Sequence, residues 1–158
     1  MRVAFDVNVF VAAVMAGEST WPVIEKVPPT SGSACADCLS LAFDADSFVL
    51  FSSPHVLTNI VTVLSRHGYS DHLVQNYLDL IVDVVEFSGG EIVQPPERDW
   101  GIGDFEDNRL LDLMVAANVD VLVSDDADLT SLNPWNGRLI LRPHEFVNRV
   151  VQNRRGSS

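Results

Sequence analysis

Short apolar segments alternate with stretches of helical periodicity along most of this chain of 158 residues. We expect strands at residues 2–7, 47–51, 91–93, 120–124 and 138–141. We expect helices at residues 9–15, 34–43, 54–66 and 105–118, and two more that begin after Ser70 and at Pro143. Because strands that alternate with helices pair in parallel, this order predicts an α/β fold, with a mostly parallel central sheet and helices on both faces.

Local signals indicate where elements begin and how the chain divides. Ser53 is followed by Pro54, and serine is favoured as an N-cap while proline is favoured at the first helical position. Residues 18–33 are rich in proline, serine and threonine, which is typical of a loop or an irregular insertion. The length suits one domain, which we expect at residues 1–152, followed by a flexible tail at residues 153–158.

The charge of the chain limits the partners that it can bind. Lysine and arginine together number 10 and aspartate and glutamate 22, so the formal net charge is −12. Binding to the phosphate backbone of a nucleic acid requires clustered cations, so this chain should not coat RNA or DNA by its overall charge. If a nucleic acid is a partner, a bound divalent metal is the obvious source of local positive charge.

The sequence indicates a soluble cytoplasmic protein. The apolar stretch at residues 9–16 is far shorter than the about 20 residues that a membrane-spanning helix needs. Asp6 and Asn8 interrupt the apolar opening, where a secretory signal would have its apolar core. Cys35 and Cys38 are too few for a secreted disulfide scaffold. Their C-x-x-C spacing follows a loop rather than a strand, which favours buried thiols over a redox pair.

Aspartates follow two of the expected strands. Asp6 follows the first strand, and Asp125 and Asp126 follow the strand at residues 120–124. The carboxyl ends of parallel strands meet at one edge of a sheet, which is where ligands bind in such folds. Asp107 lies in the first turn of its helix and in line with the apolar face of that helix, so it should point toward the sheet.

Acidic residues are unusually dense in this part of the chain, with nine acids and one base at residues 99–128. Each aspartate taken singly is more simply explained as a helix cap or a turn residue, and Asp104 is such a cap. Buried carboxylates repel one another unless a cation lies between them, so we expect Asp6, Asp107 and Asp126 together to hold a divalent metal. Oxygen ligands suit Mg²⁺ or Mn²⁺, which can polarise a phosphoryl oxygen and activate water. The pattern therefore predicts metal-assisted phosphodiester hydrolysis.

These residues resemble the motifs of a known family, the PIN-domain ribonucleases. The opening VAFDVNVFVAAV is similar to the family's first motif, an aspartate and an asparagine after an apolar strand, here Asp6 and Asn8. The stretch DFEDNRLLDLMVAANVDVLVSDDADL is similar to the third and fourth motifs. In it Asp107 is the helix acid, Ser124 is the hydroxyl at the strand end, and Asp126 is the final acid. The later LILRPHEFV is similar to the family's last strand and helix.

The resemblance implies a three-layer α/β fold with a Mg²⁺ or Mn²⁺ site that cleaves RNA. It implies that Asp6, Asp107 and Asp126 are the catalytic metal ligands, and that Asn8 and Ser124 are hydrogen-bonding supports which orient them. Small bacterial members that resemble this chain in size are VapC-type toxins of toxin–antitoxin pairs. An antitoxin protein and a homodimer are therefore expected partners, beside the RNA substrate.

The chain departs from the family pattern at two positions. The helix after the second strand usually carries a glutamate where this chain has Asn59, whose amide oxygen can still bind a metal but carries no charge. The loss of one anionic ligand should weaken metal binding and puts cleavage in question. Asp125 stands where a small residue is common, and the sequence leaves open whether Asp125 or Asp126 points inward. Asp104 and Asp125 are assigned supporting places beside the site.

A polar stripe follows one face of the helix at residues 54–66. It consists of His55, Asn59, Thr62 and Arg66, at helical spacing. The stripe could face the site and bind substrate, or it could be the solvated face of the helix.

Two other function classes fit parts of the sequence. A phospho-aspartate protein would use Asp6 as its nucleophile, but it needs a late lysine, and Lys26 is the only lysine. A degenerate PIN domain would bind RNA or a protein without cleaving it. Its contact surface would be the arginines near the C-terminus, which are more often simply solvated. These arginines are Arg138, Arg142, Arg149, Arg154 and Arg155.

Overall fold

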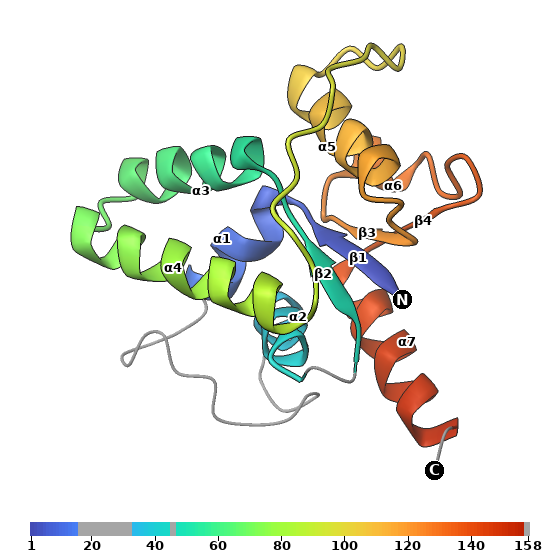
Figure 1. The fold of residues 1–158 in the computed structure, drawn as a ribbon, viewed down its shortest axis with the longest axis horizontal. Helices are drawn as coiled ribbons and strands as arrows, with labels where there is room; N and C mark the ends of the chain where they lie inside the picture. The colour runs from blue at the N-terminus through green and yellow to red at the C-terminus, as the bar shows by residue number, and fades with distance from the viewer. Residues whose placement is uncertain (16–32, 45–46, 157–158) are drawn as a thin grey trace.

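The computed structural model describes residues 1–15, 33–44 and 47–156 (Figure 1). The loop expected at residues 18–33 falls, apart from Ser33, outside the described residues, and so does Lys26. No helix in the described ranges is long and apolar enough to cross a membrane.

Four parallel strands form the sheet of the described structure, in the order β2-β1-β3-β4. The strands are β1 (Arg2–Phe5), β2 (Val49–Phe51), β3 (Val121–Val123) and β4 (Leu139–Leu141). In this register Ala4 pairs with Phe51 on one side and with Leu122 on the other. The predicted α/β fold with a parallel central sheet is confirmed.

Helices flank the sheet. They are α1 (Val7–Met15), α2 (Ala34–Ala42), α3 (Pro54–Arg66), α4 (Asp71–Phe87), α5 (Phe105–Ala116), α6 (Ala127–Thr130) and α7 (Pro143–Gly156). In Figure 1, α3 and α4 lie to one side of the sheet, and α5 and α6 lie to the other. The expected covering of both faces by helices is therefore present.

The segment at residues 91–93 is not a strand, so that prediction is wrong. It forms a single parallel bridge between Ser52 and Ile92. Pro95 and Pro96 follow closely, and proline has no N–H group with which to continue a ladder of hydrogen bonds. Pairing beside β2 therefore stops after one bridge.

Helix boundaries differ from the sequence prediction in several places. The first helix begins at Val7, directly after Asp6, rather than at residue 9. The one-turn helix α6 was not predicted, because four residues are too few to show helical periodicity. The last helix continues to Gly156, into the segment that was expected to be a flexible tail.

Serine side chains cap two helices as the sequence predicts. Ser53 Oγ accepts a hydrogen bond from the N–H of Val56 at 3.2 Å, and Ser70 Oγ accepts one from the N–H of Leu73 at 3.2 Å. Each cap satisfies a backbone donor that the first turn of a helix leaves unpaired. The direction of α3 matters for function, because this helix forms one wall of the site described below.

Aromatic rings fill the centre of the core. Phe5 at the end of β1 packs against Phe10, Phe48 and Phe146, with ring centroids 5.5–5.9 Å apart. The fully buried hydroxyl of Tyr77 donates a hydrogen bond to the carbonyl of Phe10 at 2.7 Å. These contacts tie β1, α1, α4 and α7 together and leave little freedom at the carboxyl end of β1.

A close backbone contact joins the end of α4 to β2. A Cβ atom added at Gly90 would lie 1.7 Å from the carbonyl oxygen of Leu50. No side chain fits that space, so this approach requires glycine. The contact holds β2 in line with β1.

Cys35 and Cys38 are both buried and form no disulfide, as expected for packed thiols. Burial, helped by the nearby charge of Asp125, raises the pKa of Cys35 to about 11. Burial also raises the pKa of Cys38, whose thiol donates to the carbonyl of Pro143 at 3.7 Å. A thiol that stays protonated is a poor nucleophile and a poor metal ligand.

Candidate metal centre

The carboxyl ends of β1 and β3 lie side by side, as the parallel sheet requires. Phe5 pairs with Val123, and the N–H of Asp6 donates to the carbonyl of Val123 at 2.9 Å. The buried hydroxyl of Ser124 donates to Asp6 Oδ2 at 2.7 Å. The residues that follow the two strands therefore meet at one edge of the sheet.

Three hydrogen bonds orient the Asp6 carboxylate. Its Oδ1 accepts from the N–H of Val7 at 2.6 Å, and its Oδ2 accepts from Ser124 Oγ at 2.7 Å and from Asn8 Nδ2 at 3.2 Å. Burial raises the pKa of Asp6, the hydrogen bonds from Ser124 and Val7 lower it in part, and the charge of Asp126 raises it further. Asn8 and Ser124 therefore both donate hydrogen bonds that orient the Asp6 carboxylate.

Asp126 begins α6 and carries a second acid into the same region. The N–H of Asp126 donates to Ser124 Oγ at 3.0 Å, and Asp126 Oδ1 accepts from the N–H of Asp128 at 2.8 Å. This tight turn brings the side chain of Asp128 back toward that of Asp126. Sequence reasoning did not single out Asp128. The sequence signal that could have identified Asp128 is the D-x-D spacing of Asp126 and Asp128 shortly after a buried strand.

Asp125 points away from this region. It is exposed, its N–H donates to Asn8 Oδ1 at 3.4 Å, and its Oδ2 accepts from the Cys35 thiol at 3.9 Å. Asp126 lines the pocket described below, and Asp125 does not. Of the two neighbouring acids, Asp126 is therefore the one that faces inward.

Asp107 is a buried acid whose pKa is strongly raised. Asp104 Oδ1 caps α5 by accepting from the N–H groups of Glu106 and Asp107, at 2.8 and 3.1 Å. The cap directs the side chain of Asp107 inward, where it is only 4% exposed and its Oδ2 has no hydrogen-bond partner among the residues that the structure describes. Burial raises the pKa of Asp107 to about 7, and the charges of Asp126, Asp104 and Asp6 contribute.

Carboxylate oxygens of Asp107, Asp126 and Asp128 all lie within 4.8 Å of one another. Asp6 is not a member of this triplet, but it lines the same pocket and its charge raises the pKa of Asp107. The structure therefore brings the three predicted acids into one pocket and places the Asp128 carboxylate beside those of Asp107 and Asp126.

The donor set fits a hard divalent cation. A buried carboxylate oxygen with no donor is costly unless a cation or a proton satisfies it, and Asp107 Oδ2 is such an atom within the described part of the chain. The surrounding groups are oxygen donors, which suit Mg²⁺ or Mn²⁺ better than softer metals.

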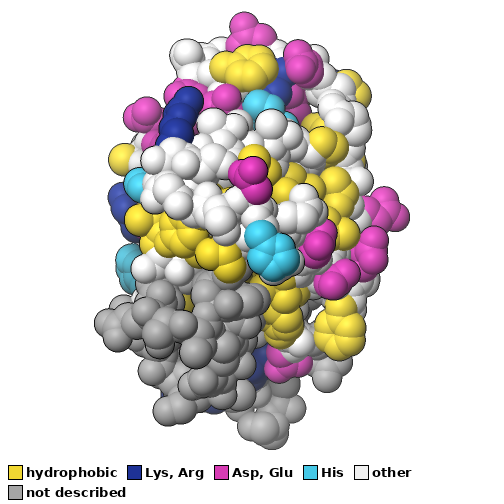
Figure 2. Space-filling view, turned by 90° about the vertical axis from the view of Figure 1, so that its left-hand side faces the viewer, with side chains coloured by type: hydrophobic (Ala, Val, Ile, Leu, Met, Phe, Trp, Pro, Cys, Tyr) yellow, Lys and Arg dark blue, Asp and Glu magenta, His cyan; other side chains and the backbone are white. Residues whose placement is uncertain are grey.

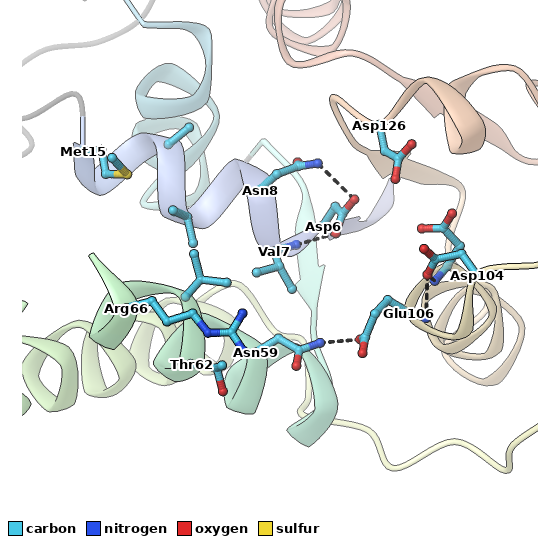
Figure 3. A pocket seen from close by; sticks show the side chains of 14 residues that line it. Asp6, Val7, Asn8, Met15, Asn59, Thr62, Arg66, Asp104, Glu106 and Asp126 are labelled. Carbon is cyan, nitrogen blue, oxygen red and sulfur yellow. Dashed lines mark hydrogen bonds between the residues drawn. The ribbon is translucent and has the colours of Figure 1, made fainter. Parts of the chain in front are cut away.

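A pocket of about 560 Å³ opens beside these acids, between α1, α3 and α5. Its lining residues are Asp6, Val7, Asn8, Val11, Ala12, Met15, Asn59, Thr62, Val63, Arg66, Asp104, Glu106, Asp107 and Asp126. Figure 3 shows Asp6, Asp104 and Asp126 at one end of the pocket, and Arg66 and Met15 at the other. The acids are therefore reachable from solvent through a pocket of mixed character.

Asn59 lines the pocket, and a carboxylate from another helix lies against it. Glu106 of α5 accepts a hydrogen bond from the Asn59 amide and contacts His55 Nε2 (Figure 3). His55 Nε2 in turn lies 3.1 Å from Asn59 Nδ2. The Glu106 carboxylate therefore lies on the α3 side of the pocket, although residue 59 itself is uncharged. Sequence reasoning missed Glu106, because its contact with Asn59 spans 47 residues of chain.

The polar stripe of α3 faces the pocket. Asn59, Thr62 and Arg66 line it, and His55 contacts both Asn59 and Glu106 at its rim. Of the two interpretations that the sequence left open, the structure places the stripe at the site rather than on a face remote from it.

Comparison with known proteins identifies one family. The model of the PIN domain matches residues 2–128 of the chain. No curated protein and no solved structure gives a significant match. The matched residues include all those that line the acidic pocket.

Proposed function

Because this chain belongs to the PIN-domain family, we propose that it is a Mg²⁺- or Mn²⁺-dependent endoribonuclease. Asp6, Asp107 and Asp126 would be its catalytic metal ligands. Asp128 would join them, since its carboxylate lies beside those of Asp107 and Asp126. The single observation that carries this proposal is the buried, unpaired Oδ2 of Asp107 among like charges, because only a cation or a proton relieves that arrangement.

The protein side of the mechanism is the positioning of charge. A metal bound to these carboxylates would polarise a phosphoryl oxygen and lower the pKa of the attacking water. Ser124 and Asn8 hold Asp6 in one orientation, and Asp104 fixes the first turn of α5 and with it Asp107. Preorganised groups of this kind need no rearrangement as charge develops on the phosphate.

Glu106 supports activity despite the amide at position 59. Its carboxylate contacts Asn59 and lines the pocket, so negative charge is present on that side of the site. We therefore favour an active enzyme, with the amide oxygen of Asn59 available as a weaker ligand.

The finer biological role is proposed from the resemblance alone. Size and motif order are similar to those of VapC-type toxins, so we propose RNA as the substrate, with an antitoxin protein and a second copy of the chain as partners. A cytoplasmic location agrees with the two buried cysteines, which form no disulfide.

The second candidate is a degenerate PIN domain that binds RNA or protein without cleaving it. The uncharged Asn59 is the observation that favours it. The C-terminal arginines give the non-catalytic candidate less support, because two of them already have partners within the protein. Arg138 donates to the carbonyl of Val119 at 3.0 Å, and Arg154 pairs with Asp44 at 2.5 Å.

Cleavage of end-labelled RNA separates the two candidates. We expect the purified chain to cut single-stranded RNA with Mn²⁺ or Mg²⁺ and to stop when EDTA is in excess. The Asp6→Asn variant, prepared identically, controls for contaminating nucleases and should be inactive. Folded protein that binds RNA but leaves it intact at every metal concentration would favour the non-catalytic module instead.

A further inference from the structure

The pocket beside the acids has two chemically different ends. One end is lined by the carboxylates, and the other is lined by α3 and by the apolar face of α1. In Figure 3 the side chain of Arg66 extends along α3 toward Asn59, and Met15 of α1 lies across the pocket from α3. A ligand that fills the pocket must therefore match acids at one end and a cation at the other.

Arg66 is the only lysine or arginine among the described residues that line the pocket. It has no ion pair with any of the residues that the structure describes. Two other arginines in these ranges have partners within the protein: Arg2 donates to the carbonyl of Ala117 at 2.8 Å, and Arg109 pairs with Asp112 at 3.0 Å. Arg66 is therefore available to an anionic ligand.

The spacing along α3 separates Arg66 from the acids. Asn59 lies beside Glu106, and Arg66 lies seven residues further on, about 10 Å along the helix axis at 1.5 Å per residue. Thr62 lies between them on the same wall and offers a hydroxyl group. The Arg66 side chain reaches back toward Asn59, and Asp6, Asp104 and Asp126 lie beyond Asn59 at the opposite end of the pocket (Figure 3). A phosphate that Arg66 contacts on the α3 side is therefore a different phosphate from one held at those carboxylates.

The opposite wall is apolar. Val7, Val11, Ala12 and Met15 of α1 line the pocket, and Met15 is 48% exposed. Such a wall can contact the face of a base or a sugar without hydrogen bonds, so it does not distinguish one base from another.

We propose that Arg66, with Thr62 and the apolar face of α1, forms a subsite for the nucleotide next to the cleaved linkage. In it Arg66 binds the phosphate that flanks the one at the acids. The inference rests on the proposed function, because it takes the carboxylate end as the place of cleavage. The overall charge of −12 makes this cation more important, since the chain as a whole repels the phosphate backbone. On the face shown in Figure 2, lysine and arginine side chains form only small, separate patches.

Binding of a fluorescent single-stranded RNA to the cleavage-deficient Asp6→Asn protein, with Mn²⁺ present, tests the subsite without turnover. Adding Arg66→Ala should weaken binding roughly tenfold, as expected for one charged hydrogen-bonded contact. It should also reduce the slope of log K against log salt by about 0.7, the value for one phosphate contact on a single strand. Arg66→Lys should restore the salt slope. Arg149→Ala, which removes an exposed arginine of α7 outside the pocket, should change neither quantity.

RNAs with one neutral methylphosphonate linkage locate the contact. Neutralising the linkage next to the cleavage site should weaken binding to the protein that retains Arg66 and have no further effect on the Arg66→Ala protein. The subsite would be overturned if Arg66→Ala and Arg149→Ala lost the same amount of RNA affinity, or if Arg66→Ala left the salt slope unchanged. Either result would count even if the RNA is cleaved. Tighter binding of a polyglutamate peptide than of RNA would also overturn it. Arg66-dependent binding of RNA that the wild-type chain never cleaves would support the subsite and reject the nuclease.

Discussion

Asp107→Asn is expected to lower the rate of metal-dependent RNA cleavage by roughly 10²- to 10³-fold, the loss typical of removing one preorganised charge-stabilising group. Asparagine has nearly the same shape as aspartate but carries no charge. Asp107 is buried, and its Oδ2 has no hydrogen-bond partner within the described residues. The substitution therefore removes the group that most needs a cation while it leaves the packing almost unchanged.

The same variant should not destabilise the metal-free protein. The charged form of Asp107 is disfavoured in the fold by burial and by its acidic neighbours, so an amide there should leave the melting temperature unchanged or raise it. Asp83→Asn removes a charge from an exposed position of α4 and is the matched control for cleavage. A marked fall in melting temperature for Asp107→Asn would show instead that this carboxylate stabilises the fold through the protein itself.

Mn²⁺ is expected to raise the melting temperature strongly. A ligand present at 1,000 times its dissociation constant stabilises the folded state by about 4 kcal/mol. For a chain of this size that corresponds to roughly 8–16 °C. Differential scanning calorimetry with Mn²⁺ and with EDTA measures the shift, and Asp107→Asn should abolish most of it. An unchanged melting curve at millimolar Mn²⁺ would contradict a metal site.

The pH dependence of that shift has a defined sign. The pKa of Asp107 is about 7 in the folded protein and 3.8 in its ordinary environment. Between these values the folded state binds more protons than the unfolded state, so this group makes the metal-free protein less stable as the pH rises from about 4 to 7. A metal needs the deprotonated carboxylate, so stabilisation by Mn²⁺ should be larger at pH 8 than at pH 6. Equal shifts at both pH values would argue that Asp107 is not a ligand.

The meeting of Asp6, Ser124 and Asp126 could be predicted from the sequence for a simple geometric reason. Asp6 and Ser124 directly follow β1 and β3, Asp126 comes two residues after Ser124, and parallel strands place their carboxyl ends at one edge of the sheet. Asp107 could be predicted because the apolar face of its helix must point toward the core. These inferences depend only on local pattern and on the parallel arrangement.

Asp128 and Glu106 were not predicted, and the reasons differ. Asp128 joins the site through a one-turn helix, which is too short to show a periodic pattern. Glu106 reaches Asn59 because α3 and α5 approach each other across the pocket, and no local pattern records that distance. The strand predicted at residues 91–93 was wrong for a related reason. A short apolar segment does not show whether the residues beside it can continue the pairing.

The most direct test of the metal centre is the anomalous diffraction of Mn²⁺ in crystals of the wild-type protein. We expect one strong peak in the anomalous difference map, coordinated by Asp107 Oδ2 and by the Asp126 carboxylate, with Asp6 and Asp128 close by. Asp107→Asn crystals grown under the same conditions should lose that peak. Wild-type crystals with saturating Mn²⁺ and no ordered ion at these carboxylates would contradict the account.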